Sequence, residues 1–325
     1  MRIALTGASG FIGSHLAEYL VNQNHQVTCL LRKTSSRRWL QHLSFREVLG
    51  DVAQPQTLQP FVQEQDVVIH AAGITKAINE TEYLIGNTES TKNLLAAIRQ
   101  LNPQLQRFVL ISSQAAAGPS LAKIPLGENA LKNPITAYGR SKALAEEITL
   151  QFGKDFPVTI IRPPTVYGPR DRDVYAYFRF VNKNLQPILG KENTVSLVYV
   201  KNLVAGIAAA MTHPHAIQQC YFITDDGQYT WSDLADMIAH ILNKRPIKIK
   251  IPNWLIQAIA GINSFYSNLT RKPVLLNREK LLEMRQPYWL AANEKAKAEL
   301  GFFPPFTTDA ALRETAVWYL ENGWL

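Results

Sequence analysis

Short apolar segments alternate with longer amphipathic ones up to residue 165, and this alternation limits the possible folds more than any other feature. Each apolar segment resembles a strand buried on both faces, and these segments span residues 2–7, 26–32, 66–73, 107–113 and 158–164. The segments between them place apolar residues three and four positions apart, as helices that cover a sheet do. The pattern predicts an α/β fold with a doubly wound parallel sheet, whose ligand binds at the carboxyl ends of the strands.

The chain has 325 residues, which suits one large domain or two smaller ones. We assign 1–168 to a Rossmann-type dinucleotide-binding domain and 169–325 mainly to a smaller, mostly helical substrate lobe. Segment 198–226 is expected to return to the first domain. In the lobe, Thr230 is expected to cap a helix with Asp233 as its reciprocal partner.

The chain begins with a strand-like segment and no basic-then-apolar leader, so we expect a cytoplasmic protein. No uncharged apolar run reaches the ~18 residues that a membrane span needs. The run 254–262 predicts a packed amphipathic helix, with a helix at a membrane interface as the alternative. Cys29 and Cys220 lie in strand-like runs and are expected to be buried free thiols.

The net charge of +8 raises the question of a nucleic-acid partner. The basic residues form separate clusters at 32–38, 244–250 and 271–285, without the interleaved aromatic residues of a nucleic-acid surface. A small anionic ligand or a solvated basic surface explains the charge, so no nucleic-acid partner is predicted. The histidines are isolated in the sequence, and no metal site is predicted.

Gly7, Gly10 and Gly13 follow the first strand and open the first helix in the segment "TGASGFIG". Glycines at this place let the backbone approach a pyrophosphate, and the N–H groups of the helix start attract its charge. The spacing differs from the usual G-x-G-x-x-G fingerprint, but the same physical argument applies. The sequence therefore predicts a dinucleotide site.

The end of the second strand indicates which dinucleotide binds. An NAD site usually places Asp or Glu about 20 residues beyond the glycines to bind the ribose hydroxyls. Here "LLRKTSSRR" supplies Arg32, with Ser35 close by. A guanidinium can pair with a 2′-phosphate that a carboxylate would repel, so NADP is favoured and NAD is the alternative.

A tyrosine and a lysine stand four residues apart in "TAYGRSKALAEE". This spacing places Tyr138 and Lys142 on one face of a helix. Taken alone, the pair is better explained as a packed aromatic ring beside a snorkelling lysine than as an acid whose strength Lys142 sets, because Tyr-x-x-x-Lys occurs often by chance.

Together these motifs resemble the extended short-chain dehydrogenases/reductases over essentially the whole chain. The glycine loop, "GDV", "HAAG", "GNTESTKNLL", "LISSQAAAG", "YGRSK" and "IRPPTVYGPRD" match successive motifs of that family. Besides Arg32 and Ser35, the resemblance implies that the cofactor is bound by Gly7, Gly10, Phe11, Ile12, Gly13, Asp51, Val52, Ala71, Ala72, Gly73, Asn87, Ser112, Lys142 and Pro163.

The resemblance also implies the catalytic roles. Tyr138 would exchange a proton with the substrate oxygen, Ser113 would hydrogen-bond that oxygen, and Lys142 would bind the nicotinamide ribose. A free tyrosine has a pKa of about 10, and the Lys142 ammonium and the nicotinamide charge would lower it. Ser113 is preferred to Ser112 because the family's serine is the second of the pair. His70 is expected to position the backbone rather than to transfer protons.

Three departures bear on the substrate. Thr165 replaces the Asn, and Val195 with Ser196 replaces the Arg-Asp pair, that nucleotide-sugar epimerases and dehydratases of this family often carry. Ala117 stands where many members have Tyr. These changes favour a less charged substrate, nearer the dihydroflavonol-reductase and hydroxysteroid-dehydrogenase side of the family. The aromatic residues of "VYAYFRF" could line such a pocket or form the core of the lobe.

The predicted function is an NAD(P)-dependent oxidoreductase that interconverts a secondary alcohol and a carbonyl on a small, moderately apolar substrate. The alternatives are a nucleotide-sugar epimerase or dehydratase that retains its cofactor, and a non-catalytic nucleotide-binding sensor or scaffold. A homodimer is predicted, with the helical segments 90–101 and 138–150 as candidate contacts.

Overall fold

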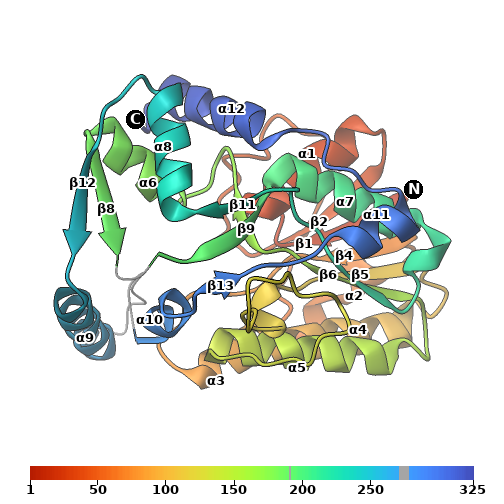
Figure 1. Cartoon of the computed structure of the whole chain (residues 1–325). Helices are drawn as coiled ribbons and strands as arrows, with labels where there is room; N and C mark the ends of the chain where they lie inside the picture. The colour runs from red at the N-terminus through yellow and green to blue at the C-terminus, as the bar shows by residue number, and fades with distance from the viewer. Residues whose placement is uncertain (190–191, 271–277) are drawn as a thin grey trace.

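The computed structural model describes residues 1–189, 192–270 and 278–325. These residues form a parallel seven-stranded sheet with helices on both faces, and a smaller lobe beside it (Figure 1). The predicted Rossmann-type α/β fold is confirmed. No helix among the described residues combines the length and the apolar character needed to cross a bilayer.

The main sheet has the strand order β10–β6–β5–β4–β1–β2–β3, and every neighbouring pair is parallel. Its strands are β1 (Arg2–Thr6), β2 (Gln26–Leu31), β3 (Arg46–Leu49), β4 (Val67–His70), β5 (Arg107–Ile111), β6 (Val158–Arg162) and β10 (Gln219–Phe222). The chain runs outward from β1 to β3 and then resumes on the other side of β1 with β4. The carboxyl ends of β1 and β4 therefore form the switch point at which such sheets bind ligands.

The edge strand β3 was not predicted from the sequence. Among its residues only Val48 is buried, so the segment lacks the apolar run that identified the other strands. It pairs with β2 through the register Leu30 to Val48.

Helices cover both faces of the main sheet (Figure 1). Leu16, Leu203 and Leu300 come from helices on one face and pack into one core cluster. Phe61, Leu95 and other residues of the opposite helices form the second cluster. The first face carries α1 (Phe11–Asn22), α7 (Val200–Thr212) and α11 (Glu294–Leu300), and the second carries α2 (Gln59–Val62), α4 (Ser90–Leu101) and α5 (Ala137–Phe152).

Short helical turns lie in the connections between strands of the main sheet. They are η1 (Pro55–Thr57), α3 (Glu80–Tyr83), the π-helical η2 (Leu84–Glu89), η3 (Gln114–Ala116) and η4 (Pro214–Ala216), which follows α7.

The second lobe contains helices and two small sheets. Its strands are β7 (Thr165–Tyr167), β8 (Leu185–Leu189), β9 (Thr194–Tyr199), β11 (Gln228–Thr230), β12 (Ile247–Ile251) and β13 (Tyr288–Trp289). Its helices are α6 (Tyr175–Asn182), α8 (Trp231–Ile241), α9 (Asn253–Thr270), α10 (Arg278–Met284) and α12 (Thr308–Glu321). The predicted capping box of Thr230 and Asp233 opens α8.

The aromatic residues of "VYAYFRF" belong mainly to the core of this lobe. Phe178 is fully buried there, and Tyr175 and Tyr177 pack against the same core. The ring of Tyr177 stacks on Trp231 with the centroids 4.5 Å apart. Phe180 is 37% exposed. Of the two interpretations of this segment, packing within the lobe accounts for three of its four rings.

The turn between β1 and α1 brings backbone segments into direct contact. Gly7 has a φ of +74°, which favours glycine, and a Cβ there would lie 2.6 Å from the carbonyl carbon of Ala71. A Cβ on Gly13 would lie 2.0 Å from the carbonyl oxygen of Gly7. The start of α1 can therefore lie against the ends of β1 and β4 only while both positions are glycine.

We predict that Gly13→Ala lowers the free energy of unfolding by about 1–3 kcal/mol or more, because the added methyl group meets backbone that cannot yield. Urea denaturation measures this loss. Gly127→Ala is the control, since a Cβ there meets nothing within 4 Å, and its stability should equal or slightly exceed that of the wild type. Equal stability of both variants would contradict the packing described for the loop.

Candidate active site

Segments that are distant in the sequence meet at the carboxyl edge of the main sheet. Gly7 follows β1, Arg32 follows β2, Ala71 follows β4, Ser113 follows β5 and Pro163 follows β6. Because all these strands are parallel and adjacent, their carboxyl ends share one edge. The sheet therefore gathers most of the predicted site residues along a single line.

The glycine loop leaves the start of α1 open to an anion. Gly10 is the N-cap and has no side chain that could accept from the N–H groups of Phe11, Ile12 and Gly13. The turn is closed by backbone bonds alone, from Gly10 N to Gly7 O at 2.9 Å and from Ser14 N to Gly10 O at 2.9 Å. The residues present thus fit a pyrophosphate at the N-terminus of α1.

The loop after β4 is fixed to the end of β1. The Ala72 N–H donates to Thr6 Oγ1 at 3.1 Å, and Thr6 Oγ1 lies 2.7 Å from Nδ1 of the buried His70. Burial, with the charge of Lys142, lowers the pKa of His70 to about 3, so the ring is neutral. Through these contacts with Thr6, His70 positions the backbone of the "HAAG" turn against the end of β1.

Arg32 is exposed at the end of β2. Its backbone N–H donates to Ser35 Oγ at 3.0 Å, which fixes the turn that carries both residues. The neighbouring Arg37 forms an ion pair with Glu47 at 2.6 Å. Arg32 thus lies at the end of β2, the position from which the sequence predicts a contact with the adenosine ribose.

The predicted adenine contacts form a turn beyond β3. Asp51 Oδ1 accepts from the Ala53 N–H at 3.0 Å, and Val52 packs partly against the core. The carbonyl oxygen of Val52 accepts from Asn93 Nδ2 at 3.1 Å, so α4 holds this turn in place.

Asn87 connects the turn after β4 with helix α5. Its Oδ1 accepts from Ile74 N at 2.9 Å, and its Nδ2 donates to Ser141 Oγ at 2.9 Å. A Cβ on Gly73 would lie 2.9 Å from Asn87 Oδ1 and 3.7 Å from Lys142 Nζ. Asn87, Gly73 and Lys142 thus form one compact group.

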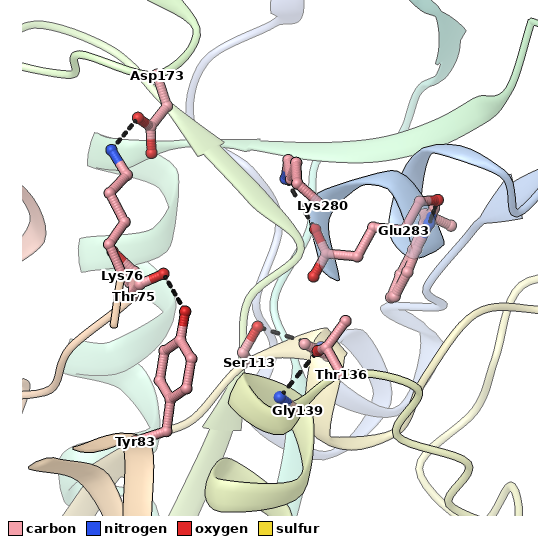
Figure 2. Close-up of polar contacts among 11 residues, drawn as sticks. Thr75, Lys76, Tyr83, Ser113, Thr136, Gly139, Asp173, Lys280 and Glu283 are labelled. Carbon is pink, nitrogen blue, oxygen red and sulfur yellow. Dashed lines mark hydrogen bonds and ion pairs between the residues drawn. The ribbon is translucent and has the colours of Figure 1, made fainter. Parts of the chain in front are cut away.

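Ser113 and Tyr138 are brought together from β5 and α5. Ser113 is the N-cap of η3, and its Oγ accepts from Ala115 N at 3.1 Å. Thr136 caps α5 by accepting from Gly139 N at 3.1 Å, which places Tyr138 in the first turn of the helix. A Cβ on Gly139 would lie 2.5 Å from the carbonyl oxygen of Ala115, so the first turn of α5 packs directly on η3; Figure 2 shows the bond from Gly139 to Thr136 at this junction.

Tyr138 is half-buried, and the loss of water around its hydroxyl raises its pKa to about 12. A hydrogen bond with Ser113 opposes this rise, whereas the charge of Glu283 adds to it. The lowering that was expected from the Lys142 charge is not among the causes of this shift, of which burial is the largest. In this structure Tyr138 is a neutral phenol, which is the proton-donating form.

Lys142 lies one turn beyond Tyr138 and is buried. Its Nζ donates to the carbonyl oxygen of Ile111 at 2.7 Å, at the end of β5. Burial lowers the pKa of Lys142 to about 8, while the charge of Glu146 raises it. The lysine is therefore fixed against the sheet beside Gly73 and remains mainly protonated at neutral pH.

A buried ionic cluster behind α5 was missed by the sequence analysis. Glu146 accepts from Arg162 Nε at 2.9 Å and Nη2 at 2.7 Å, and from Ser112 Oγ at 2.6 Å. Lys132 Nζ lies 2.9 Å from the same carboxylate. Burial alone would raise the pKa of Glu146, but these partners hold it below its usual value. The Ser112 hydroxyl donates to Glu146, and its contact with the cofactor stays a prediction.

Helix α10 adds two carboxylates beside the start of α5. Glu279 Oε1 accepts from the Ala137 N–H at 2.8 Å. Glu283 bonds Lys280 Nζ at 2.8 Å, and its carbonyl oxygen accepts from Trp289 Nε1 at 2.9 Å. In Figure 2 the Glu283 side chain lies above Ser113 and Thr136. No motif identifies these residues, because they reach the site from a distant part of the chain.

The predicted residues thus form two groups along the carboxyl edge of the main sheet. The first group, on the β1 side of the edge, consists of the glycine loop, the "HAAG" turn and Arg32. Ser113, Tyr138 and Lys142 occupy the other half, where Pro163 is buried and its carbonyl accepts from Gln114 N at 2.8 Å. The buried cluster left no local signal, since Arg162 and Lys132 are 16 and 14 positions from Glu146 in the sequence.

The sequence profile of the NAD dependent epimerase/dehydratase family matches residues 3–223 of the chain. The chain therefore belongs to this family, and it is an enzyme of the extended short-chain dehydrogenase/reductase type.

Curated relatives and solved structures align with most of this chain. A ceramide reductase from Caulobacter vibrioides (strain NA1000 / CB15N) is 26% identical over 329 residues, which are 99% of this chain and 96% of the relative. A 4-hydroxy-2-methyl-3-oxo-4-farnesyl-3,4-dihydroquinoline-1-oxide ketoreductase from Stigmatella aurantiaca is 28% identical, over 93% of this chain and 92% of the relative. A UDP-glucose 4-epimerase from Thermotoga maritima, solved with UDP-glucose, has a TM-score of 0.82 and covers 99% of both chains. At 19% identity this last likeness concerns the fold alone.

We predict that Glu146→Gln lowers the free energy of unfolding by about 3 kcal/mol or more, because Arg162 then keeps a buried charge without its counterion. The pKa of Glu146 is lowered in the folded state, so its contribution is present above about pH 4.3 and is lost as the pH falls further. The difference between variant and wild type should shrink in that range. Denaturation at neutral and acidic pH measures both effects.

Glu147→Gln is the matched control, since the neighbouring carboxylate is exposed. Its stability should differ from the wild type by about 0.5 kcal/mol or less. If both variants were equally stable at neutral pH, the cluster would not hold α5 as described.

Proposed function

We propose that the protein is an NADP-dependent reductase that converts a carbonyl group on a moderately apolar substrate into a secondary alcohol. The observation that carries this proposal is the position of Tyr138, in the first turn of α5 next to Ser113 and one helical turn from Lys142, whose Nζ is fixed to Ile111 O. This arrangement can give a proton to a carbonyl oxygen and hold that oxygen in place.

The chemistry divides between cofactor and protein. Bound NADPH supplies the hydride that reduces the carbonyl carbon. Ser113 donates a hydrogen bond to the substrate oxygen, and Tyr138 transfers its hydroxyl proton to that oxygen as the negative charge develops. The positive charge of Lys142, kept close by its bond to Ile111 O, stabilises the phenolate that remains. Solvent then returns the proton to Tyr138.

The choice of NADP depends on Arg32. An exposed guanidinium at the end of β2 suits a 2′-phosphate, with which it can form charge-assisted hydrogen bonds. Ser35, whose hydroxyl accepts from Arg32 N, sets the position of this turn.

Apolar surroundings support an apolar substrate. Tyr138 packs in a small cluster with Ile74, Ala77, Tyr83 and Ala137, and Ala115 to Ala117 are buried beside η3. The ceramide reductase and the farnesyl dihydroquinoline ketoreductase among the relatives also act, by name, on molecules with long hydrocarbon parts. A ketone with a hydrocarbon chain or ring system is the proposed substrate class.

A nucleotide-sugar epimerase is the second candidate, because the family to which the chain belongs is named for epimerases and dehydratases. Such an enzyme needs cations for the substrate diphosphate. Three arginines could replace the missing diphosphate contact, Arg170, Arg172 and Arg179. Arg170 is already engaged with Glu18 at 2.6 Å, and Arg172 and Arg179 are exposed. At the position of the family's Arg-Asp pair, Ser196 Oγ accepts from Ala291 N at 3.1 Å. These contacts favour the reductase.

We predict that the purified protein oxidises added NADPH in the presence of apolar ketones. With NADPH deuterated at the transferred position, the released alcohol should carry the deuterium. Tyr138→Phe should lower kcat by about 10²–10⁴-fold, because it removes the proton donor, and leave the Kd for NADPH nearly unchanged.

Tyr83→Phe is the control for this variant. The Tyr83 ring lies 5.9 Å from that of Tyr138, and its hydroxyl donates to Thr75 O at 3.4 Å (Figure 2). It should keep a kcat close to that of the wild type. A retained cofactor with no net redox change would instead support the epimerase, and wild-type turnover by Tyr138→Phe would remove the proposed proton donor.

A separate prediction concerns the cofactor. Arg32→Ala should raise the Kd for NADPH about 10- to 150-fold, the effect of losing about 1.5–3 kcal/mol of charge-assisted bonding, and should leave the Kd for NADH little changed. Isothermal titration calorimetry measures both. Arg99→Ala removes an equal charge from an exposed position on α4 and should change neither value. Tighter binding of NADH than NADPH by the wild type would contradict the assignment.

A further inference from the structure

Helix α9 carries an apolar surface on its outward side. Trp254 is 70% exposed, Ile262 68% and Ile259 40%. With 3.6 residues per turn, these three side chains fall within about 140° of one side of the helix. Ile256 and Ala260, on the opposite side, are buried against the lobe. The helix therefore has a second apolar side in addition to the one that packs.

The composition of α9 is unusual for a surface helix. Its sequence, from Asn253 to Thr270, contains no charged residue. A surface helix of a globular protein normally turns charged side chains toward water and confines its apolar residues to the packed side. Large apolar side chains gathered on an exposed face are typical of a contact with another apolar phase or partner.

A cationic segment leads directly into this helix. The residues "KRPIKIK", 244–250, carry four basic and no acidic side chains, and only Pro252 separates the end of β12 from α9. Lys248 and Lys250 are exposed, as is Ile247 at 68%. Lys248 makes a solvent-exposed ion pair with Asp236 at 3.0 Å. An apolar helix beside basic residues is complementary to an anionic lipid surface, where the ring and aliphatic chains enter the interface and the ammonium groups meet the headgroups.

The position of α9 connects this surface with the candidate active site. Figure 1 shows α9 at the periphery of the lobe, next to α10 and the end of β12, and α9 contacts α10. Helix α10 in turn holds the start of α5 through Glu279, whose carboxylate accepts from Ala137 N beside Tyr138. A lipid surface under α9 would therefore lie close to the elements that border the site.

We propose that the outward side of α9, together with residues 244–250, docks the protein on an anionic phospholipid bilayer. The docking does not depend on the catalytic assignment. A docked protein could take an apolar substrate directly from the bilayer, and this role of the surface rests on the proposed function.

The test is flotation of the full chain with vesicles of phosphatidylcholine containing phosphatidylglycerol, and with vesicles of phosphatidylcholine alone. The wild type should float with the anionic vesicles at about 0.1 M salt and much less at about 1 M, where screening is short-ranged. Trp254→Ser combined with Ile262→Ser should lower the partition coefficient about tenfold or more, because two large apolar side chains no longer leave water. Lys250→Glu should lower it on anionic vesicles only.

The matched control is Leu121→Ser combined with Leu131→Ser. These leucines are 90% and 93% exposed in another part of the molecule, so their replacement should leave vesicle binding unchanged. All variants should keep the thermal midpoint of the wild type, since the altered side chains are exposed, and should keep the wild-type rate on a water-soluble ketone.

Three outcomes would overturn the proposal: no flotation of the wild type at low salt, equal binding by the α9 variant and the leucine control, or loss of an oligomer on substitution of α9. In the last case, detected by light scattering, α9 would be an interface between copies of the chain. Vesicle binding by a protein that reduces no ketone would leave the docking surface standing and would count against the proposed function alone.

Discussion

The attachment of helix α5 to the ends of β5 and β6 is the constraint on which the rest of the site depends. Two buried cations make this attachment: Lys142 donates to Ile111 O, and Arg162 binds Glu146 through two hydrogen bonds. Each charge is costly to bury and is stable only while its partner stays in place. The helix therefore has one position on the sheet, and that position brings Tyr138 against Ser113.

On the β1 side of the carboxyl edge of the sheet, the glycine loop is held by close backbone contacts and not by buried charges. Gly7 and Gly13 let α1, β1 and β4 approach more closely than side chains would permit. The result is an uncapped helix start that suits a pyrophosphate, next to a turn that carries Gly73 toward Lys142. The glycine loop lies where the strand order reverses at β1 and β4, and Ser113 and Pro163 follow the adjoining strands β5 and β6 at the same edge, so the fold itself determines where cofactor and substrate would meet.

Much of this could be predicted from the sequence, because buried parallel strands and glycine turns leave strong local patterns. The sheet and the capping box of α8 followed from such patterns. The proximity of Tyr138 to Ser113 followed from the family resemblance. Strand β3 escaped notice because only Val48 is buried. The contact of Glu279 with Ala137 spans 142 positions, and no local pattern encodes it. The raised pKa of Tyr138 depends on its burial, which the Tyr–Lys spacing does not report.

The central proposal is that a dinucleotide lies along the glycine loop, with its nicotinamide ribose at Lys142 and its nicotinamide facing Tyr138. A crystal structure of the complex with NADP and a carbonyl substrate tests it most directly. The account predicts the pyrophosphate at the N-terminus of α1, the 2′-phosphate at Arg32, and a carbonyl substrate held between the Tyr138 hydroxyl and the nicotinamide at near-attack distances of about 3–3.5 Å. A nucleotide bound elsewhere, or a nicotinamide remote from Tyr138, would contradict it.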